Sequence, residues 1–423
     1  PRGLVHDGLP HLLGRVEVFL AAQGQHTCEL LHCKKTTAVK TASARYRDEE
    51  AAILRELIAS MADGLIPNRP AEGAQPADFA AADTTLWLFE AARLMADALG
   101  DAHPFVTDEL LLALRDAFDA ALRGTRHGIH VTEAGLFAAG RPTDALTWMD
   151  ARLRGAPVTP RAGCPVELSA LWAKGCETLA RLAHAAGDLP LAERAAAECQ
   201  RTRKAFQARF WCAETGYPYD VISELAEGPE AFHDASLRPN AVIALAVDPD
   251  CFTSEQALEV LDRAQALVTR AGLRTLAPEQ PGYTGRAGGI AEQRDAAAHQ
   301  GAIWPFLLGF FVRAARRSAA EAHLGPLLQR LVASAAANEA ALGQLPELAE
   351  GDPPHAPAGC FKRRRQVQAL YEGPEVRRDN RFDKSIRFSK HFSRFDIHGS
   401  IEANHTTKGT QRISIKRLEC SGS

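Results

Sequence analysis

The stretch DEEAAILRELIASM, residues 48–61, has the pattern that decides the fold. Its apolar residues, including Leu54 and Leu57, recur every three or four positions, so that a helix would be apolar on one face and charged on the other. Asp63 and Gly64 follow, a combination typical of a helix end. The sequence therefore predicts an amphipathic helix that must bury one face against other elements.

The same spacing of apolar residues continues through the middle of the chain, residues 47–345, which is rich in Ala, Leu, Arg and Glu. Few alternating runs of β-branched residues interrupt it, so helices must pack on helices and the sequence predicts an all-α fold. Loops with Gly, Pro or Asp mostly separate the further predicted helices. These helices are expected at 81–99, 105–123, 165–186, 190–211, 238–246, 253–271, 300–316 and 319–341.

Composition excludes several classes of function. The chain has 423 residues, with 49 Lys and Arg against 52 Asp and Glu, and its formal charge of -3 gives no general reason to bind nucleic acid or anionic membrane. No apolar run approaches the roughly 20 residues of a membrane span, and no signal peptide opens the chain. We therefore expect a soluble cytoplasmic protein that binds neither nucleic acid nor membrane.

The nine cysteines are an odd number and show neither a CxxC pair nor the Cys/His spacing of a zinc site. We expect small buried thiols rather than a disulfide framework. No glycine-rich phosphate loop and no cluster of metal-ligand residues stands out in the sequence. The sequence thus predicts no metal and no other cofactor.

Unusual residue choices gather in the predicted loops. Trp, Asp, Glu, Arg and His concentrate there, as a carbohydrate site requires, because aromatic faces cover sugar rings and charged groups bind hydroxyls. In chain order the segments are GLIPNR (64–69), DTTLW (83–87), LTWMDAR (146–152), TPR (159–161), PVEL (165–168), LRPN (237–240), GYTG (282–285), RD (294–295), HQGAIWP (299–305), GQLPE (343–347), GDPP (351–354) and GC (359–360).

In this order the segments resemble the amylo-α-1,6-glucosidase family, the glucosidase half of glycogen debranching enzymes. The resemblance covers roughly residues 47–360. It implies an (α/α)6 barrel whose active site lies in the loops at one end. The predicted helices, even with one more at 9–22, are fewer than such a barrel contains, so we expect the barrel to be incomplete at both ends.

The resemblance implies a reaction as well: hydrolysis of the α-1,6-linked glucose left as a branch stub on glycogen or limit dextrin, with inversion at the anomeric carbon. This reaction needs a protonated carboxyl and a carboxylate about 6.5–9.5 Å apart. Asp150 matches the family's general acid, and burial beside Trp148 and Met149 would raise its pKa. Glu347 is the best match for the general base, with Glu350 as the competing candidate.

The resemblance suggests aromatic and polar residues for sugar binding, each with a structural alternative. Trp87, Trp148 and Trp304 either stack on a glucose ring or fill the barrel. His299 and Gln300 precede a predicted helix, where substrate binding and core packing are both open.

Charged residues form a second set of candidates. Arg161, Glu167, Arg294 and Asp295 either bind sugar hydroxyls or pair with one another as buried charges. Four further polar residues in the motifs are interpreted as loop braces or helix caps. These are Asn68, Asp83, Arg238 and Asn240.

Both ends depart from the family pattern. Residues 1–46 lack the Gly-Arg-Asp-Thr motif of the family's first barrel helix, and FKRRR (361–365) stands where an apolar closing helix is expected. Residues 361–423 contain 15 basic and 7 acidic side chains, which is typical of a solvated or disordered tail, with an anion- or RNA-binding arm as the alternative. We expect an atypical segment 1–46, polar and irregular from 23 onward, a glucosidase domain 47–360 and an out-of-frame or disordered tail 361–423.

Other functions stay open. Among enzymes, a glucoamylase-like or trehalase-like α-glucosidase would share the barrel. From another class, the chain would be a catalytically inactive or truncated barrel that binds glycan. A sugar epimerase fits less well because it relies on histidine proton shuttles and only His299 is well placed. Under the main hypothesis the binding partner of the chain is its substrate, glycogen or another branched α-glucan.

Overall fold

The computed structural model describes residues 39–71, 74–224, 232–318, 320, 324–328, 330–331 and 344–363. The predicted helix at 9–22 and most of the basic tail lie outside these residues. The chain divides after Val376, and the fold below is that of the first unit, Pro1–Val376, which contains all the described residues. In the part of the chain described, no helix has both the length and the apolar character needed to cross a bilayer.

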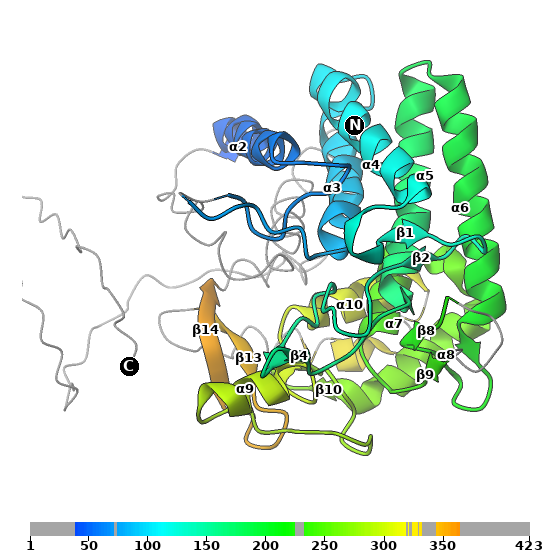
Figure 1. Cartoon of the computed structure of the whole chain (residues 1–423). Helices are drawn as coiled ribbons and strands as arrows, with labels where there is room; N and C mark the ends of the chain where they lie inside the picture. Colours follow the sequence, from blue (N-terminus) through cyan, green and yellow to red (C-terminus); the bar gives the residue numbers. More distant parts are fainter. Residues whose placement is uncertain are drawn as a thin grey trace, which may run out of the picture. The chain divides into compact units, whose positions relative to one another are not determined.

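Helices from the middle of the chain alternate between an inner and an outer position (Figure 1). The inner helices follow one another around the core, each in contact with the next, and the outer helices cover them. This alternation is that of an (α/α) barrel, as predicted. The inner helices are α3 (Asp83–Leu99), α5 (Val166–Ala185), α7 (Asn240–Val247) and α10 (Leu307–Arg317); the outer ones are α4 (Leu111–Arg123), α6 (Leu189–Arg209) and α8 (Ser254–Ala264).

The central helix α5 shows why these residues form a barrel. It packs against α3, α6 and α7 and is buried on most of its surface, with one polar stripe, Lys174, Glu177, Arg181 and His184, left partly or fully exposed. Trp172, which is fully buried, stacks on Phe118 of α4 at 5.5 Å and meets Phe89 of α3 edge-on at 6.2 Å. Gly175 allows this approach, because a Cβ there would lie 3.0 Å from the Phe89 ring.

Several helices differ from the sequence prediction, and the one predicted at 300–316 begins only at Leu307, because residues 303–304 form the strand β12. The helix expected at 48–61 is α2 (Val39–Ala59), so residues 39–46, predicted to be irregular, are helical. Their Ala, Lys and Arg residues are good helix formers even though they show little apolar period. A helix not predicted, α9 (Ala291–Ala298), forms where a loop was expected, and Gln293 accepts the backbone N–H of Ile290 at its start. The helix predicted at 319–341 is described only in part, with residues 324–328 helical.

A five-stranded antiparallel sheet was also not predicted. Its order is β10 (Val268–Thr269), β11 (Gly272–Arg274), β12 (Ile303–Trp304), β13 (Gln344–Ala349) and β14 (Pro357–Arg363). In the β13–β14 hairpin, Gln344 lies opposite Arg363 and Leu348 opposite Ala358. Residues 361–363 therefore belong to a strand, and the prediction that a tail begins at 361 is wrong for them, because hairpin pairing outweighs their charge.

Short elements complete the loops between the helices. The helix predicted at 253–271 ends at Ala264, where a single turn, η5 (Gln265–Leu267), leads into β10. A π-helical turn, η2 (Phe105–Leu110), runs directly into α4. The remaining antiparallel ladders are β1 (His130–Val131) with β2 (Phe137–Ala138), β3 (Arg152–Leu153) with β4 (Ala156–Pro157), β5 (Cys164–Pro165) with β8 (Val221–Ile222) and β8 with β9 (His233–Asp234), and β6 (Trp211–Cys212) with β7 (Tyr217–Pro218).

Candidate active site

The two carboxylates nominated as acid and base lie within electrostatic reach of each other. Asp150 immediately precedes β3, and Glu347 lies in the middle of β13, in a strand rather than in the loop expected from the sequence. The Glu347 side chain is buried. Its negative charge lies close enough to raise the pKa of Asp150. The fold therefore brings together two acids that are separated by almost half the chain.

Asp150 has the electrostatics of a proton donor. Its side chain opens to solvent on one side and is surrounded by protein on the others. The partial removal from water raises the pKa of Asp150 to about 6, and the charge of Glu347 adds to the rise, while a backbone hydrogen bond and Arg152 oppose it. A carboxyl group with such a pKa keeps its proton in mildly acidic solution and can pass it to a leaving group.

Asp83 is a third acid in this region, which sequence reasoning interpreted as a brace or cap. It begins α3 and is 5% exposed. Burial, followed by the charges of Glu167 and Asp150, raises the pKa of Asp83 to about 8 against the hydrogen bonds of the first backbone N–H groups of α3. Its Oδ2 atom has no hydrogen-bond partner among the described residues. The signal was present in DTTLW, since an acid at the start of an apolar inner helix is expected to be buried.

Aromatic rings cluster around Trp148, two residues before Asp150. The Trp148 ring meets His299 at 5.4 Å and Trp304 at 5.9 Å, both edge-on, and His299 stacks on Trp304 at 5.5 Å. Trp148 and Trp304 are both partly exposed, so ring surface is left for a ligand. Trp87, by contrast, is 6% exposed and packs on Phe310 in the core, where it fills the barrel.

His299 is a buried neutral donor next to the acid. Burial, together with the positive charges of Arg238 and Arg161, lowers the pKa of His299 to about 3. Its Nδ1 accepts the backbone N–H of Ala151, the residue after Asp150, at 3.4 Å. The single ring proton must then be on Nε2. This atom is buried and has no partner within the described residues, so it is available to a ligand.

The polar groups of Gln300 form hydrogen bonds to other groups of the protein. Its amide N–H groups donate to the Val158 carbonyl at 3.0 Å and to the Thr159 hydroxyl at 3.2 Å. Its carbonyl oxygen accepts from Arg238 at 2.9 Å, and Arg238 also donates to the carbonyl of His299 at 2.7 Å. These bonds brace the loop that carries His299.

Arg161 and Glu167 pair with each other below the site. Both side chains are 2% exposed, and the Arg161 fork donates to both Glu167 oxygens and, at 2.9 Å, to Asp220. Burial alone would lower the pKa of Arg161, but the charges of Asp220 and Glu167 outweigh it and raise the pKa. The structure thus shows the buried pairing that the sequence left open. Arg294 and Asp295 differ, because both are exposed on α9, which packs beside β3.

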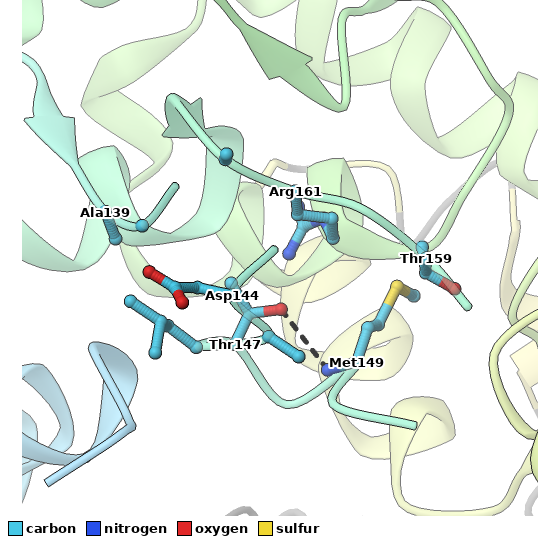
Figure 2. A pocket seen from close by; sticks show the side chains of 10 residues that line it. Ala139, Asp144, Thr147, Met149, Thr159 and Arg161 are labelled. Atoms are coloured by element: carbon cyan, nitrogen blue, oxygen red, sulfur yellow. Dashed lines mark hydrogen bonds between the residues drawn. The ribbon is translucent and has the colours of Figure 1, made fainter. Parts of the chain in front are cut away.

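A narrow recess lies behind the acid segment (Figure 2). Figure 2 shows the Thr147 hydroxyl directed at the backbone of Met149, whose N–H it accepts at 3.3 Å, with Arg161 above them. The recess is too narrow for a water molecule. It is therefore a packing gap under the segment that leads to Asp150 and no binding cavity for a sugar.

One group of carboxylates in the described part of the chain has metal-like spacing: Glu177, Asp248 and Asp250. Arg203 already lies among them. It donates to both oxygens of Asp248, at 2.9 and 2.7 Å, and to Glu177, and it lies 3.3 Å from Asp250. This guanidinium supplies the positive charge that a cation would bring, so the group is a salt-bridge network.

Sequence comparison identifies relatives of the chain. A family model described as amylo-alpha-1,6-glucosidase matches residues 39–372. The glycogen debranching enzyme of Saccharomyces cerevisiae is 27% identical over 229 residues. This match covers 45% of the chain but only 15% of the yeast protein, so the chain spans a small part of that relative.

Comparison with solved structures gives the fold. Three crystal structures of the GH63 mannosylglycerate hydrolase of Thermus thermophilus are similar: with Tris (TM-score 0.57, 12% identity), with Tris and D-glycerate (0.58, 13%) and with glucose (0.56, 12%). Each covers 86% of the chain, which covers 91–92% of each of them. GH63 enzymes are (α/α)6 barrel glycosidases, so the similarity confirms the predicted fold.

Proposed function

The chain belongs to the amylo-α-1,6-glucosidase family, and from this membership we propose that it removes single α-1,6-linked glucose residues from glycogen or limit dextrin. The family is one of glycoside hydrolases, so the substrate is a glycan. The observation that carries the proposal is the pairing of Asp150, with its raised pKa, and the buried Glu347 in one site.

The proposed reaction uses the two carboxyls in opposite roles. Asp150 gives its proton to the glycosidic oxygen as the bond to the anomeric carbon breaks. Glu347 takes a proton from a water molecule that attacks this carbon from the other face, so that glucose leaves with the inverted, β configuration. The exchange of protons with solvent then restores Asp150 to its protonated form and Glu347 to its ionised form. Glu350, which follows β13, is the competing base.

The other groups of the site suit a ligand with many hydroxyls. Trp148 and Trp304 offer partly exposed ring surface to the apolar side of a sugar. Asp83 Oδ2 and His299 Nε2 are buried polar atoms without hydrogen-bond partners in the described residues, an arrangement that is costly until a ligand supplies the bonds. We assign them to hydroxyls of the glucose that is cleaved.

The remaining candidate residues either support the site through bonds within the protein or are exposed beside it. Arg161, Glu167 and Gln300 support the site from behind, because their polar atoms are largely bonded within the protein. Arg294 and Asp295 are exposed and are assigned to the glucan beyond the cleaved residue.

We also propose a cytoplasmic location, where glycogen is stored. Five of the nine cysteines have side chains that the structure describes, and all five are buried and form no disulfide: Cys164, Cys176, Cys199, Cys212 and Cys251. Free buried thiols of this kind are typical of proteins from a reducing compartment.

The proposal is tested by glucose release from a phosphorylase limit dextrin, with maltose and trehalose assayed in parallel. We expect release from the limit dextrin and little from the other two substrates. Release mainly from maltose or trehalose would favour a glucoamylase-like or trehalase-like enzyme. Retention on glycogen in a native affinity gel without release of glucose would favour a glycan-binding barrel.

Asp150→Asn and a matched control complete this test. The control is Asp116→Asn, which changes an exposed aspartate on α4. We expect Asp150→Asn to lower the rate about 10²–10⁴-fold, the usual contribution of a general acid or base, and the control to keep its activity.

A further inference from the structure

The side chain of Asn240 joins the start of α7 to the segment that carries Asp150. Asn240 is fully buried at the first position of α7. Its Oδ1 accepts the indole N–H of Trp148 at 2.8 Å, and its Nδ2 lies 3.6 Å from the sulfur of Met149. Trp148 and Met149 are the two residues directly before Asp150, so one amide side chain holds both.

Asp220 fixes the other end of this amide. It lies between β7 and β8, is 3% exposed, and accepts the Asn240 Nδ2–H on Oδ1 at 2.7 Å. Its Oδ2 accepts from Arg161 at 2.9 Å, and Arg161 is paired in turn with Glu167 of α5. Trp148 is thereby connected through buried side chains to the inner helix α5.

The chemistry of the partners leaves the amide one orientation. The indole N–H can only donate, so the amide oxygen of Asn240 must face it and the amide N–H groups must face Asp220. If the Asn240 amide were rotated by 180°, its N–H would face the indole N–H and its oxygen would face Asp220. The connection therefore specifies a single geometry, and an apolar or acidic side chain at 240 cannot reproduce it.

The segment on both sides of Asp150 is held in the same way. On one side Met149 donates its backbone N–H to Thr147 Oγ1 at 3.3 Å, and on the other Ala151 donates its backbone N–H to His299 Nδ1 at 3.4 Å. The Trp148 ring packs edge-on against His299 and Trp304. The backbone from which the Asp150 side chain projects is thus held on both sides.

We infer that Asn240 and Asp220 are positioning residues, which hold Trp148 so that Asp150 meets the glycosidic oxygen. The inference rests on the proposed function, since it assigns Asp150 the role of general acid. It goes beyond that function because Asn240 and Asp220 would affect the rate of the reaction although neither side chain contacts the substrate. Misplacement of a reacting group by about 1 Å can cost 10²-fold in rate, so loss of the connection should be visible in kcat.

The test is Asn240→Leu, which keeps the approximate volume of the side chain and removes both hydrogen bonds. We expect kcat on limit dextrin to fall about 10–100-fold with little change in KM. α-Glucosyl fluoride needs no proton from the enzyme, because fluoride leaves unaided, so its hydrolysis should change little. The control Gln207→Leu, which removes an exposed side-chain bond to the carbonyl of Asp250, should leave both activities unchanged.

A readout besides activity is the indole N–H resonance of Trp148, identified by its loss in Trp148→Phe. Asn240→Leu should shift it and speed its exchange with solvent. An unmoved resonance, or equal losses on limit dextrin and the fluoride, would overturn the inference and leave the proposed function standing. A wild-type protein inactive on both substrates would overturn both.

If Asn240→Leu does not fold, Trp148→Phe removes the donor of this hydrogen bond together with part of the ring surface, a loss of surface that affects the glucose of both substrates alike. The inference then requires the same selective loss on limit dextrin, and equal losses on the two substrates would overturn it.

Discussion

Because Asp83 is buried, we expect the free energy of unfolding of the protein to depend on pH through this carboxyl. The pKa of Asp83 is about 8 in the folded protein, against an ordinary value of 3.8. Between these two values the folded state holds a proton that the unfolded chain has lost. The free energy of unfolding must therefore fall as the pH rises from about 4 to 8.

The magnitude follows from the shift. At about 1.4 kcal/mol per pH unit, keeping this carboxyl protonated costs the folded state about 4 kcal/mol at pH 7 but only about 2 kcal/mol at pH 5. Asparagine has nearly the same shape and cannot ionise. Asp83→Asn should therefore be more stable than the wild type, and its advantage should grow by about 2–3 kcal/mol from pH 5 to pH 7.

Urea denaturation of both proteins at pH 5, 6 and 7, followed by circular dichroism, measures this difference. Comparing the two proteins cancels the contributions of other titrating groups. The control Asp116→Asn changes an exposed aspartate, which water solvates in both states, and should show no growing advantage. Parallel pH profiles for the wild type and Asp83→Asn would refute the reasoning.

Three further predictions concern the acid, the base and a helix cap. Because the pKa of Asp150 is about 6 and the general acid must be protonated, kcat/KM of the wild type should decline as the pH rises through about 6, and Asp150→Asn should abolish this decline with most of the activity. Glu347→Gln should fail on both limit dextrin and α-glucosyl fluoride, and rescue by the fluoride would identify Glu347 as the acid instead. Thr253→Ala removes the capping box with Gln256 at the start of α8 and should cost about 1 kcal/mol in urea denaturation, while an unchanged midpoint would show that the cap contributes nothing.

The inner helices were predictable because their sequence signals are local. The helix predicted at 165–186 is α5, Val166–Ala185, and Gly187 and Asp188 mark its end in the sequence as in the structure. Apolar side chains cover most of this segment and only one polar stripe interrupts them, a pattern that requires a largely buried position. This local pattern predicted helices packed on helices, whereas the (α/α)6 barrel was implied by the resemblance to the amylo-α-1,6-glucosidase family.

The sheet was not predictable in this way. Its strands β10, β11 and β12 have two or three residues each, too few to show a period, and they are held by partners far away in the chain. Glu347 was consequently expected in a loop rather than in a strand. The strand β13 places it within electrostatic reach of Asp150, a relation that no local signal contains.

The candidate site residues also differ in whether a local signal in the sequence reveals their role. Asp150 was nominated through ordered family motifs, whereas Asp83 and Asn240 were interpreted as caps or braces. No side-chain cap is formed at the start of α3 or of α7. The roles of both residues depend on tertiary neighbours: Glu167 and Asp150 around the first, Asp220 and Trp148 around the second.

The most direct test of the two-carboxyl mechanism is the configuration of the glucose released from limit dextrin, followed by proton NMR before mutarotation. The wild type should release β-glucose first, and Asp150→Asn should release almost none in the same time. Release of α-glucose first, or release by Asp150→Asn at the wild-type rate, would contradict inverting hydrolysis by Asp150 and Glu347.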